Sequence, residues 1–447
     1  MVTEGTEAAR LLLGMDPVWF AGVLFVMTYV VIMTDRLNRA IVSLMAAGLM
    51  IAAGLLNQEA ALHGIDFNTI GLLTGMMIIV AITKKSGIFQ FLAIWSAKKV
   101  DARPWGILVM LAVVTAVLSA LLPNVTTVLM IAPVTLLITD ALKVNPYPYL
   151  FAQIFAANIG GTATLIGDPP NIMIGSAAGL SFNDFVVNLA PLVVVVFAAT
   201  LLPIYLIWGR NLTSTPEHRQ RVLDYRESDA ITDKRLLWQS LSVLAIVITG
   251  FTLADVLNVE VATVAMFGAS LLLLLDNLPR SPGEQNKVVE QTFAEIEWQT
   301  IFFFIGLFIL VYGLGTTGLM EDVAHDLLEL TGGNTKVTAI SLLWASAVAS
   351  AFVDNIPYVA TMIPLIKSMS ASLGGPQALV PIWWSLSLGS CLGGNGTLVG
   401  SSSNLIIASF AERTGRPIRF LPFLLMAFPL MLLSLLISTV YVYLRYL

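Results

Sequence analysis

The chain has 447 residues, of which 57% are hydrophobic and only 11% are charged, and its mean hydropathy is +0.86. A soluble domain carries roughly 25% charged residues, so this composition excludes a water-soluble protein and indicates one embedded in a lipid bilayer. The net charge of −5 comes with no basic patch for nucleic acid, and the single cysteine, Cys391, excludes an internal disulfide and a multi-cysteine metal site.

The chain begins with MVTEGTEAAR, which has two glutamates and no basic region, so we expect no signal peptide there. The apolar run Pro17–Met33 therefore stays as the first helix. Arg36 and Arg39 follow it, and short basic loops remain in the cytoplasm. We expect a multi-pass protein of the cell (inner) membrane with its N-terminus outside.

The two halves of the sequence repeat each other. Asp66–Ile70 aligns with Glu297–Ile301 at an offset of 231, and at the same offset Asn124 meets Asn355. Further on, Gly160–Gly167 matches Gly393–Gly400 at an offset of 233. Chance similarity between apolar helices does not match Gly, Pro and Asn in register, so the pattern predicts an internal duplication.

Basic residues orient these repeats in the bilayer. The linker 210–235 is strongly basic and is expected in the cytoplasm, as is the lysine-rich segment that follows the third helix. The repeat partner of that segment, about 315–334, has no Lys or Arg and is expected outside. Matching segments on opposite faces predict inverted-topology repeats, a plan common among secondary transporters.

The predicted domains follow from this layout. We expect a first repeat (1–209) with scaffold helices about 17–83, transport elements about 104–180 and a linking helix about 189–209; the linker 210–235; and a second repeat (236–447) with scaffold helices about 236–314, transport elements about 337–412 and a final helix about 420–445.

Each repeat contains an interrupted apolar stretch between segments of like orientation. In the first, Leu122–Thr127 interrupts the run 105–142, and in the second, Asp354–Pro357 interrupts the run 338–373. Cytoplasmic-type charges at both ends of the first run favour a re-entrant helical hairpin. The alternative is a proline-kinked helix followed by another full span.

A second interruption in each repeat is rich in glycine. Asn158–Asn171 contains three glycines and two prolines within a span, and 393–404 repeats the break with glycines and serines. Glycine destabilises a helix by roughly 1 kcal/mol and proline by about 3 kcal/mol relative to alanine, so both stretches should unwind. Isolated glycines such as Gly48 are read as packing positions, whereas the clustered glycines are read as a site.

Unwound backbone at membrane depth is tolerated where protein, water or ligand meets its polar groups. Half-helix N-termini would aim N–H groups and a partial positive charge inward. The predicted substrate-binding residues are neutral donors, acceptors and glycines: Asn124, Thr126, Thr127, Gly160, Gly161, Thr162, Thr164, Asn171, Asn355, Gly393, Gly394, Asn395, Thr397, Ser401 and Asn404.

Two carboxylates are candidates for proton coupling, because an ionisable group at membrane depth is a functional hypothesis by default. Asp354 precedes the second tip asparagine, and Asp168 lies in the first break, where it could instead cap the following half-helix. No arginine or lysine is evident near the breaks, which disfavours a dicarboxylate substrate. Cys391 is interpreted as a small buried residue rather than a thiol ligand.

At these motifs the sequence resembles the ion transporter superfamily over essentially its whole length. Asn124-Val125-Thr126 and Asn355-Ile356-Pro357 resemble the paired Ser-Asn-Thr tips of that superfamily, with Pro123 and Asp354 in place of the serines. Gly160–Asn171 is similar to the pattern of the ArsB/NhaD permease and P-protein branch. The resemblance implies an elevator mechanism, in which a transport domain slides against a scaffold.

The resemblance favours gradient-driven efflux of arsenite or antimonite, coupled to proton antiport. A sodium/proton antiporter and a sodium-coupled carrier of dicarboxylates or other small anions stay open, as does a channel as a different class. An intramembrane protease is excluded because Leu165 stands where an aspartyl type needs glycine and no histidine lies at membrane depth. We expect no cofactor and no metal site; a homodimer and a separate ATPase subunit stay open as partners.

Overall fold

The computed structural model describes residues 14–34 and 36–447, and the regular elements of this part of the chain are helices. Eight of the helices within it are long and apolar enough to cross a membrane, and α1, α2 and α13 are shorter apolar helices. The expectation of a multi-pass helical membrane protein is confirmed at this level. The expectations for the first ten residues lie outside the described part.

The helices of the first half are α1 (Pro17–Met33), α2 (Arg39–Ala52), α3 (Gln58–His63), α4 (Phe67–Lys84), α5 (Ile88–Lys99), α6 (Pro104–Leu121), α7 (Asn124–Ala141), α8 (Tyr147–Gly161), α9 (Pro169–Ala178) and α10 (Phe182–Ile204). A short π-helical turn (Tyr205–Gly209), α11 (Pro216–Leu223) and a 3-10 turn (Glu227–Ala230) lead to the second half.

The second half contains α12 (Lys234–Leu257), α13 (Val261–Asn277), α14 (Pro282–Ala294), α15 (Trp298–Gly315), α16 (Leu319–Leu330), α17 (Thr335–Phe352), α18 (Asn355–Ser368), α19 (Ser370–Leu373), a 3-10 turn (Pro376–Leu379), α20 (Val380–Gly393), α21 (Ser402–Arg413) and α22 (Phe420–Tyr446).

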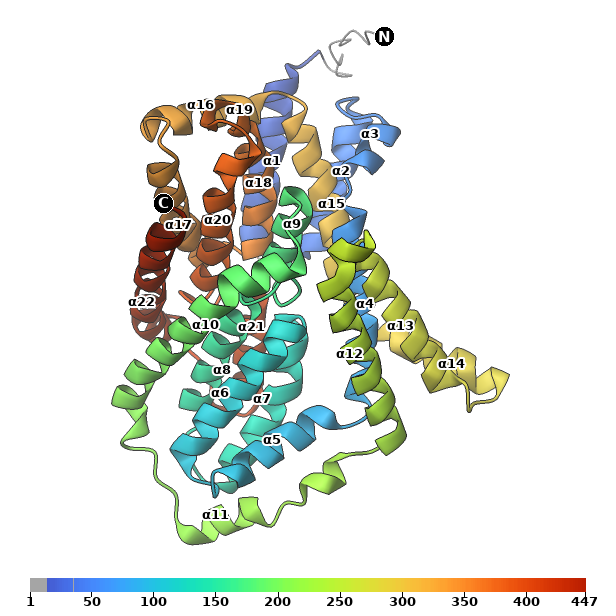
Figure 1. The fold of residues 1–447 in the computed structure, drawn as a ribbon, viewed down its shortest axis with the longest axis vertical. Helices are drawn as coiled ribbons and strands as arrows, with labels where there is room; N and C mark the ends of the chain where they lie inside the picture. Colours follow the sequence, from blue (N-terminus) through green and yellow to red (C-terminus); the bar gives the residue numbers. More distant parts are fainter. Residues whose placement is uncertain (1–13, 35) are drawn as a thin grey trace.

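Corresponding helices of the two halves pack in the same way. The most extensive contacts join α6 to α8 and α17 to α20 in one part of the molecule, and α4 to α13 and α2 to α15 in another. Figure 1 shows the α6–α7 pair extending from one end of the molecule and the α17–α18 pair from the opposite end, with both turns toward the middle. The two turns therefore approach the same region from opposite directions.

The helices α8 and α20 form the centre of this arrangement. Every residue from Pro148 to Gly161 is buried, and so is every residue from Ile382 to Gly393. Neither helix has an exposed face over these ranges, whereas long helices such as α12 and α22 leave apolar side chains such as Val256 and Leu444 exposed. Such exposure suits contact with lipid.

One predicted boundary is wrong. The linking helix, expected from about residue 189, begins at Phe182. Ser181 and Asp184 form a capping box there, in which each side chain bonds to the backbone N–H of the other residue. A reciprocal cap of this kind satisfies two backbone donors and so favours an earlier start.

Candidate functional site

The two hairpin turns have the same backbone geometry. Leu122 and Val353 are extended, and the next residues, Pro123 and Asp354, have φ/ψ of −55°/137° and −50°/134°. The asparagine that follows begins the second helix of each pair. Asn124 is 3% exposed and Asn355 is 4% exposed, so both tips end inside the protein.

The helices are interrupted in the two stretches for which glycine content predicts unwinding. The first break separates Gly161, the end of α8, from Pro169, the start of α9. The second separates Gly393, the end of α20, from Ser402, the start of α21. Pro169 and Pro170 occupy the first turn of α9, where the missing N–H groups would have no intrahelical partner.

Asn171 and Asn404 hold the breaks together. The Asn171 Nδ2 donates to the carbonyl oxygens of Thr164 at 3.0 Å and Thr162 at 3.3 Å. The Asn404 Nδ2 donates to those of Gly394 at 2.8 Å and Thr397 at 2.9 Å. Both side chains are fully buried. These amides, predicted to bind substrate, are occupied in satisfying the carbonyls that unwinding exposes.

Gly160 and Gly393, which the sequence predicts to bind substrate, lie in close contact with the backbone of the hairpin helices. A Cβ on Gly160 would lie 2.2 Å from the Ala116 oxygen, and one on Gly393 would lie 2.5 Å from the Ala347 oxygen. Hydrogen bonds reinforce these approaches: the Ser119 Oγ donates to Ala157 O at 2.8 Å. In both halves, glycine lets the hairpin helix contact the broken helix backbone to backbone.

A cavity of about 40 Å³ lies where the tips meet the breaks. Four of the predicted residues line it: Asn124, Asp168, Asn355 and Ser401. The remaining predicted substrate residues are not among its lining residues: Thr126, Thr127, Gly160, Gly161, Thr162, Thr164, Asn171, Gly393, Gly394, Asn395, Thr397 and Asn404. Thr162, Thr164 and Thr397 instead donate to backbone carbonyls.

Polar atoms of this cavity are available for a solute. The Asn124 Nδ2 is buried and has no hydrogen-bond partner in the described part of the chain. Asp168 is 2% exposed and accepts a 3.3 Å hydrogen bond from the Asn355 Nδ2. Asp168 precedes α9, but its side chain makes no capping bond. An unsatisfied buried donor is costly, so Asn124 is suited to meet a bound oxygen.

Arg39 is one of two charged lining residues that the sequence pattern did not predict. It begins α2 and also lines the cavity, so the expectation that no basic side chain lies near the breaks is wrong. The Arg39 Nη1 is 2.8 Å from the Asp354 Oδ2 and 3.0 Å from the Ser402 Oγ. The available signal was its position directly at the start of an apolar helix, where a basic residue also marks the cytoplasmic side.

A larger cavity of about 730 Å³ adjoins the first and shares Arg39, Glu297 and Ser402 with it. Asp354 lines this larger space, which we call the vestibule. Glu297 is a second missed residue, and its place at the head of a repeated segment was the available signal. In the residues described here, no group of three His, Cys, Asp or Glu side chains could hold a metal ion.

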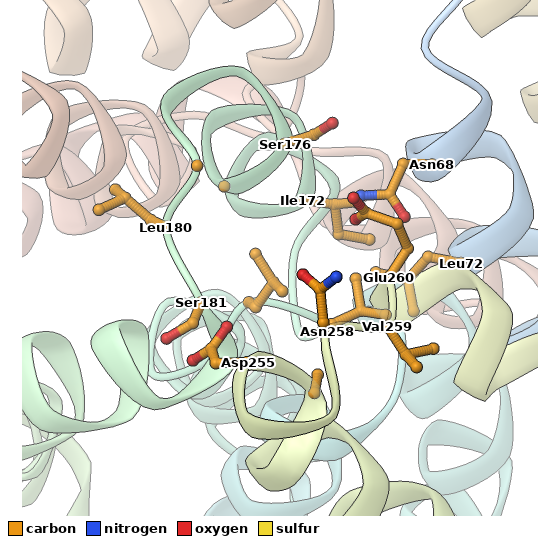
Figure 2. Close-up of a pocket in the computed structure, with 15 residues that line it drawn as sticks. Asn68, Leu72, Ile172, Ser176, Leu180, Ser181, Asp255, Asn258, Val259 and Glu260 are labelled. Carbon is orange, nitrogen blue, oxygen red and sulfur yellow. The ribbon is translucent and has the colours of Figure 1, made fainter.

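Two further cavities lie away from the tip cavity and the vestibule. One, of about 470 Å³, is lined by residues of α9, α15 and α18. The other, of about 320 Å³, lies between α4, α9 and the end of α12 with the turn that joins it to α13; Figure 2 shows Asp255 near the end of α12 and Asn258 and Glu260 on that turn. None of the predicted site residues lines either cavity.

Comparison with known proteins decides the family. The sequence model of the citrate transporter family, CitMHS, matches residues 29–389. The chain belongs to the CitMHS family. This CitMHS protein is 41% identical over 427 residues to the Mycobacterium tuberculosis protein "Uncharacterized transporter Rv2684", covering 95% of this chain and 97% of that one. It is 31% identical to the human P protein over 83% of this chain and 52% of that one.

Two solved structures share the fold. The Alcanivorax borkumensis YdaH transporter superposes with a TM-score of 0.58 at 14% identity, covering 96% of this chain and 98% of that one. Neisseria gonorrhoeae MtrF, described as one of a class of antimetabolite efflux pumps, gives 0.57 at 12% identity, covering 96% and 95%. The CitMHS protein is thus a secondary transporter of the CitMHS and P-protein kind.

Proposed function

We propose that this transporter works by an elevator mechanism with two inverted repeats. The helices that carry the tips and breaks form the moving transport domain, and α1–α4 with α12–α15 form the scaffold. The corresponding helix packing in the two halves and the opposed hairpins support this division. So do the cavities, which lie between the two groups of helices, where a sliding transport domain would expose its site alternately.

The solute that suits the site best is a small uncharged oxyacid of the arsenite or antimonite type. The charge balance carries this proposal: the tip cavity and vestibule together are lined by Arg39 and by three carboxylates, Asp168, Asp354 and Glu297. Arg39 is already paired with Asp354. A di- or tricarboxylate would meet a surplus of negative charge here, whereas arsenous acid, which is uncharged near neutral pH, would not.

The size of the tip cavity agrees with a small solute. Its volume of about 40 Å³ has room for about two or three water-sized groups. Three hydroxyl oxygens could meet the Asn124 amide, the Asp168 carboxylate and the Ser401 hydroxyl. The vestibule would admit a tricarboxylate, but the space between the tips would not hold one without rearrangement.

Proton antiport is the coupling that this site favours. Asp168 is buried at the tip cavity and has no basic partner within the described contacts. A proton on Asp168 would neutralise it on the return movement, and solute hydroxyls would replace that proton in the loaded state. Asp354 is a second coupling candidate, although its pairing with Arg39 gives it a counter-charge. We propose that the protein belongs to the ArsB/NhaD branch, and the buried Asp168 at the tip cavity supports this proposal.

Transport into everted membrane vesicles tests this function. With an imposed pH gradient, the wild-type chain is expected to accumulate arsenite and to leave succinate and citrate outside. Asn124→Ala should reduce arsenite transport about three- to tenfold, the value of one hydrogen bond, while Asn286→Ala on the exposed face of α14 should not. Sodium-dependent succinate or citrate uptake without arsenite transport would overturn the proposal.

A further inference from the structure

An ion pair joins the proposed scaffold to the second hairpin tip. Arg39, the first residue of α2, donates hydrogen bonds to Asp354 and to Ser402 on α21. The Ser402 Oγ also donates to the Asp354 Oδ2 at 3.0 Å. The guanidinium lies over the Phe303 ring, 5.2 Å from its centroid. The side chains of Arg39 and Asp354 are 30% and 19% exposed, so both face the vestibule.

The fold does not require this pair. Pro123 holds the position that matches Asp354 at the offset of 231, and it forms a tip with nearly the same backbone angles. Val261 begins α13 as Arg39 begins α2. The first half thus builds the matching tip without the aspartate, and the second half builds the matching scaffold helix without the arginine. The pair therefore has a role beyond holding the chain together.

The surroundings of Arg39 are those of a carboxylate site. An arginine fork matches a carboxylate geometrically and is more weakly hydrated than a lysine ammonium. Neutral donors from Ser402, Thr300 and Gln299 line the same vestibule. The Asp354 carboxylate occupies the position on Arg39 that the carboxylate of a solute would otherwise take.

The geometry points to Asp354 as a specificity-determining residue: it is an internal counter-ion that occupies Arg39 and so excludes carboxylate solutes from the vestibule. The inference rests on the proposed function, because it explains how a member of a citrate transporter family could favour an uncharged solute. It predicts that removing this one negative charge creates an anion site. The chemical class admitted would be small mono- and dicarboxylates.

Binding to the purified full-length protein in detergent tests this without any transport measurement. Asp354→Asn keeps the size of the side chain and an oxygen that can cap α18 through the Ile356 N–H, as Asp354 now does. Succinate, titrated at constant ionic strength, should stabilise this variant against unfolding, and the effect should saturate. The Kd should be about tenfold or more below that of wild type, because one charge-assisted hydrogen bond is gained. Asp354→Ser provides a second variant with a capping hydroxyl.

Matched variants identify the groups responsible. Arg39→Gln combined with Asp354→Asn should lose the gained succinate binding. Asp255→Asn, the same change at an exposed position near the end of α12 and at a different cavity, should gain none. If folded Asp354→Asn and Asp354→Ser both bind succinate no better than wild type, the counter-ion role is wrong. If wild type itself binds succinate or citrate as tightly as the variants, the role is also wrong.

The two proposals fail in distinguishable ways. Suppose that wild-type vesicles transport arsenite but the variants gain no succinate binding. The proposed function would then hold, and only the counter-ion role would be wrong. If arsenite is not transported but the variants clearly gain succinate binding, the counter-ion role would hold and the proposed solute would be wrong. In that second case Asp354 would still be the internal counter-ion of Arg39, and a different solute would have to be identified.

Discussion

Asn355, at the tip of the second hairpin, donates a hydrogen bond from its Nδ2 to the Oδ2 of Asp168, in the break of the first half, across 3.3 Å. The two residues are 187 positions apart in the chain. This bond is the direct link between one half's tip and the other half's break, and it lies at the cavity that we assign to the solute. Four predictions follow from the geometry around it.

Replacing the glycines at the hairpin contacts should destabilise the protein. In Gly160→Ala or Gly393→Ala, the new methyl group would meet backbone atoms 2.2 to 2.5 Å away. Backbone cannot move aside as a flexible side chain can, so we expect a loss of about 1–3 kcal/mol, as for overpacked cores. Thermal unfolding of the detergent-purified protein measures it.

Gly48→Ala is the control for this experiment, because nothing lies within 4 Å of a Cβ there. It is inside α2, where alanine favours the helix over glycine by roughly 1 kcal/mol, so its unfolding temperature should stay the same or rise. Equal stability of Gly160→Ala and wild type would contradict the backbone-to-backbone packing.

Asn171 and Asn404, which span the breaks, should contribute to the stability of the fold rather than to solute binding. Asn171→Ala and Asn404→Ala would each leave buried carbonyl oxygens without a donor, at about 1–3 kcal/mol for an unsatisfied group. We expect a lower unfolding temperature and less folded protein by size-exclusion chromatography. Asn286→Ala, on an exposed helix face, should change neither. Stable variants with a raised KM would instead show that these amides bind the solute.

Cys391 should be dispensable for transport. Its Sγ is fully buried, lies 3.4 Å from the Asn171 Oδ1, and is not part of the tip-cavity lining. We expect Cys391→Ala to export arsenite within about twofold of wild type, the effect of losing one weak hydrogen bond. Complete loss of arsenite transport by a folded Cys391→Ala protein would show that the thiol takes part.

Joining the scaffold to the second hairpin should stop an elevator. The Tyr29 Oη on α1 lies 2.7 Å from the Thr361 Oγ1 on α18 and donates to the Pro357 carbonyl. In a Cys391→Ala background, Tyr29→Cys with Thr361→Cys can be bridged by a bifunctional methanethiosulfonate. We expect arsenite export to stop on bridging and to return on reduction.

The control pair for the bridge lies within one hairpin. The Ser346 Oγ and Tyr358 Oη, on α17 and α18, are 3.1 Å apart, and bridging cysteines there should leave transport largely intact. Unchanged export after complete bridging of positions 29 and 361 would rule out sliding of the hairpin past α1.

The sequence was most informative where local chemistry decides the backbone. Glycines and prolines cannot sustain a helix, so the breaks after Gly161 and Gly393 lie where composition predicts them. The turns before Asn124 and Asn355 could be located because proline or aspartate interrupts a long apolar run. The early start of α10 was missed because its capping box depends on two side chains bonding to each other's backbone.

The residue types of the tip cavity could be predicted only in part. Asn124, Asn355, Asp168 and Ser401 line it as expected, since they belong to the tips and breaks themselves. Other polar residues of the same segments, such as Thr164 and Asn404, turn inward to satisfy carbonyls. A polar side chain can point toward a solute or back toward its own backbone. The spacing of the repeats does not indicate which of these directions it takes.

By itself, the sequence determined that this is a helical membrane protein and where the helices unwind, because hydropathy and backbone propensity act within a few residues; the repeat of its two halves was a prediction from the sequence. Only the tertiary structure decided that Arg39 meets Asp354, 315 residues away, that Asn355 meets Asp168, and that Gly160 and Gly393 lie against the backbone of the hairpin helices. Those relationships depend on which helices cross and how closely, and that is settled by the packing of the whole molecule.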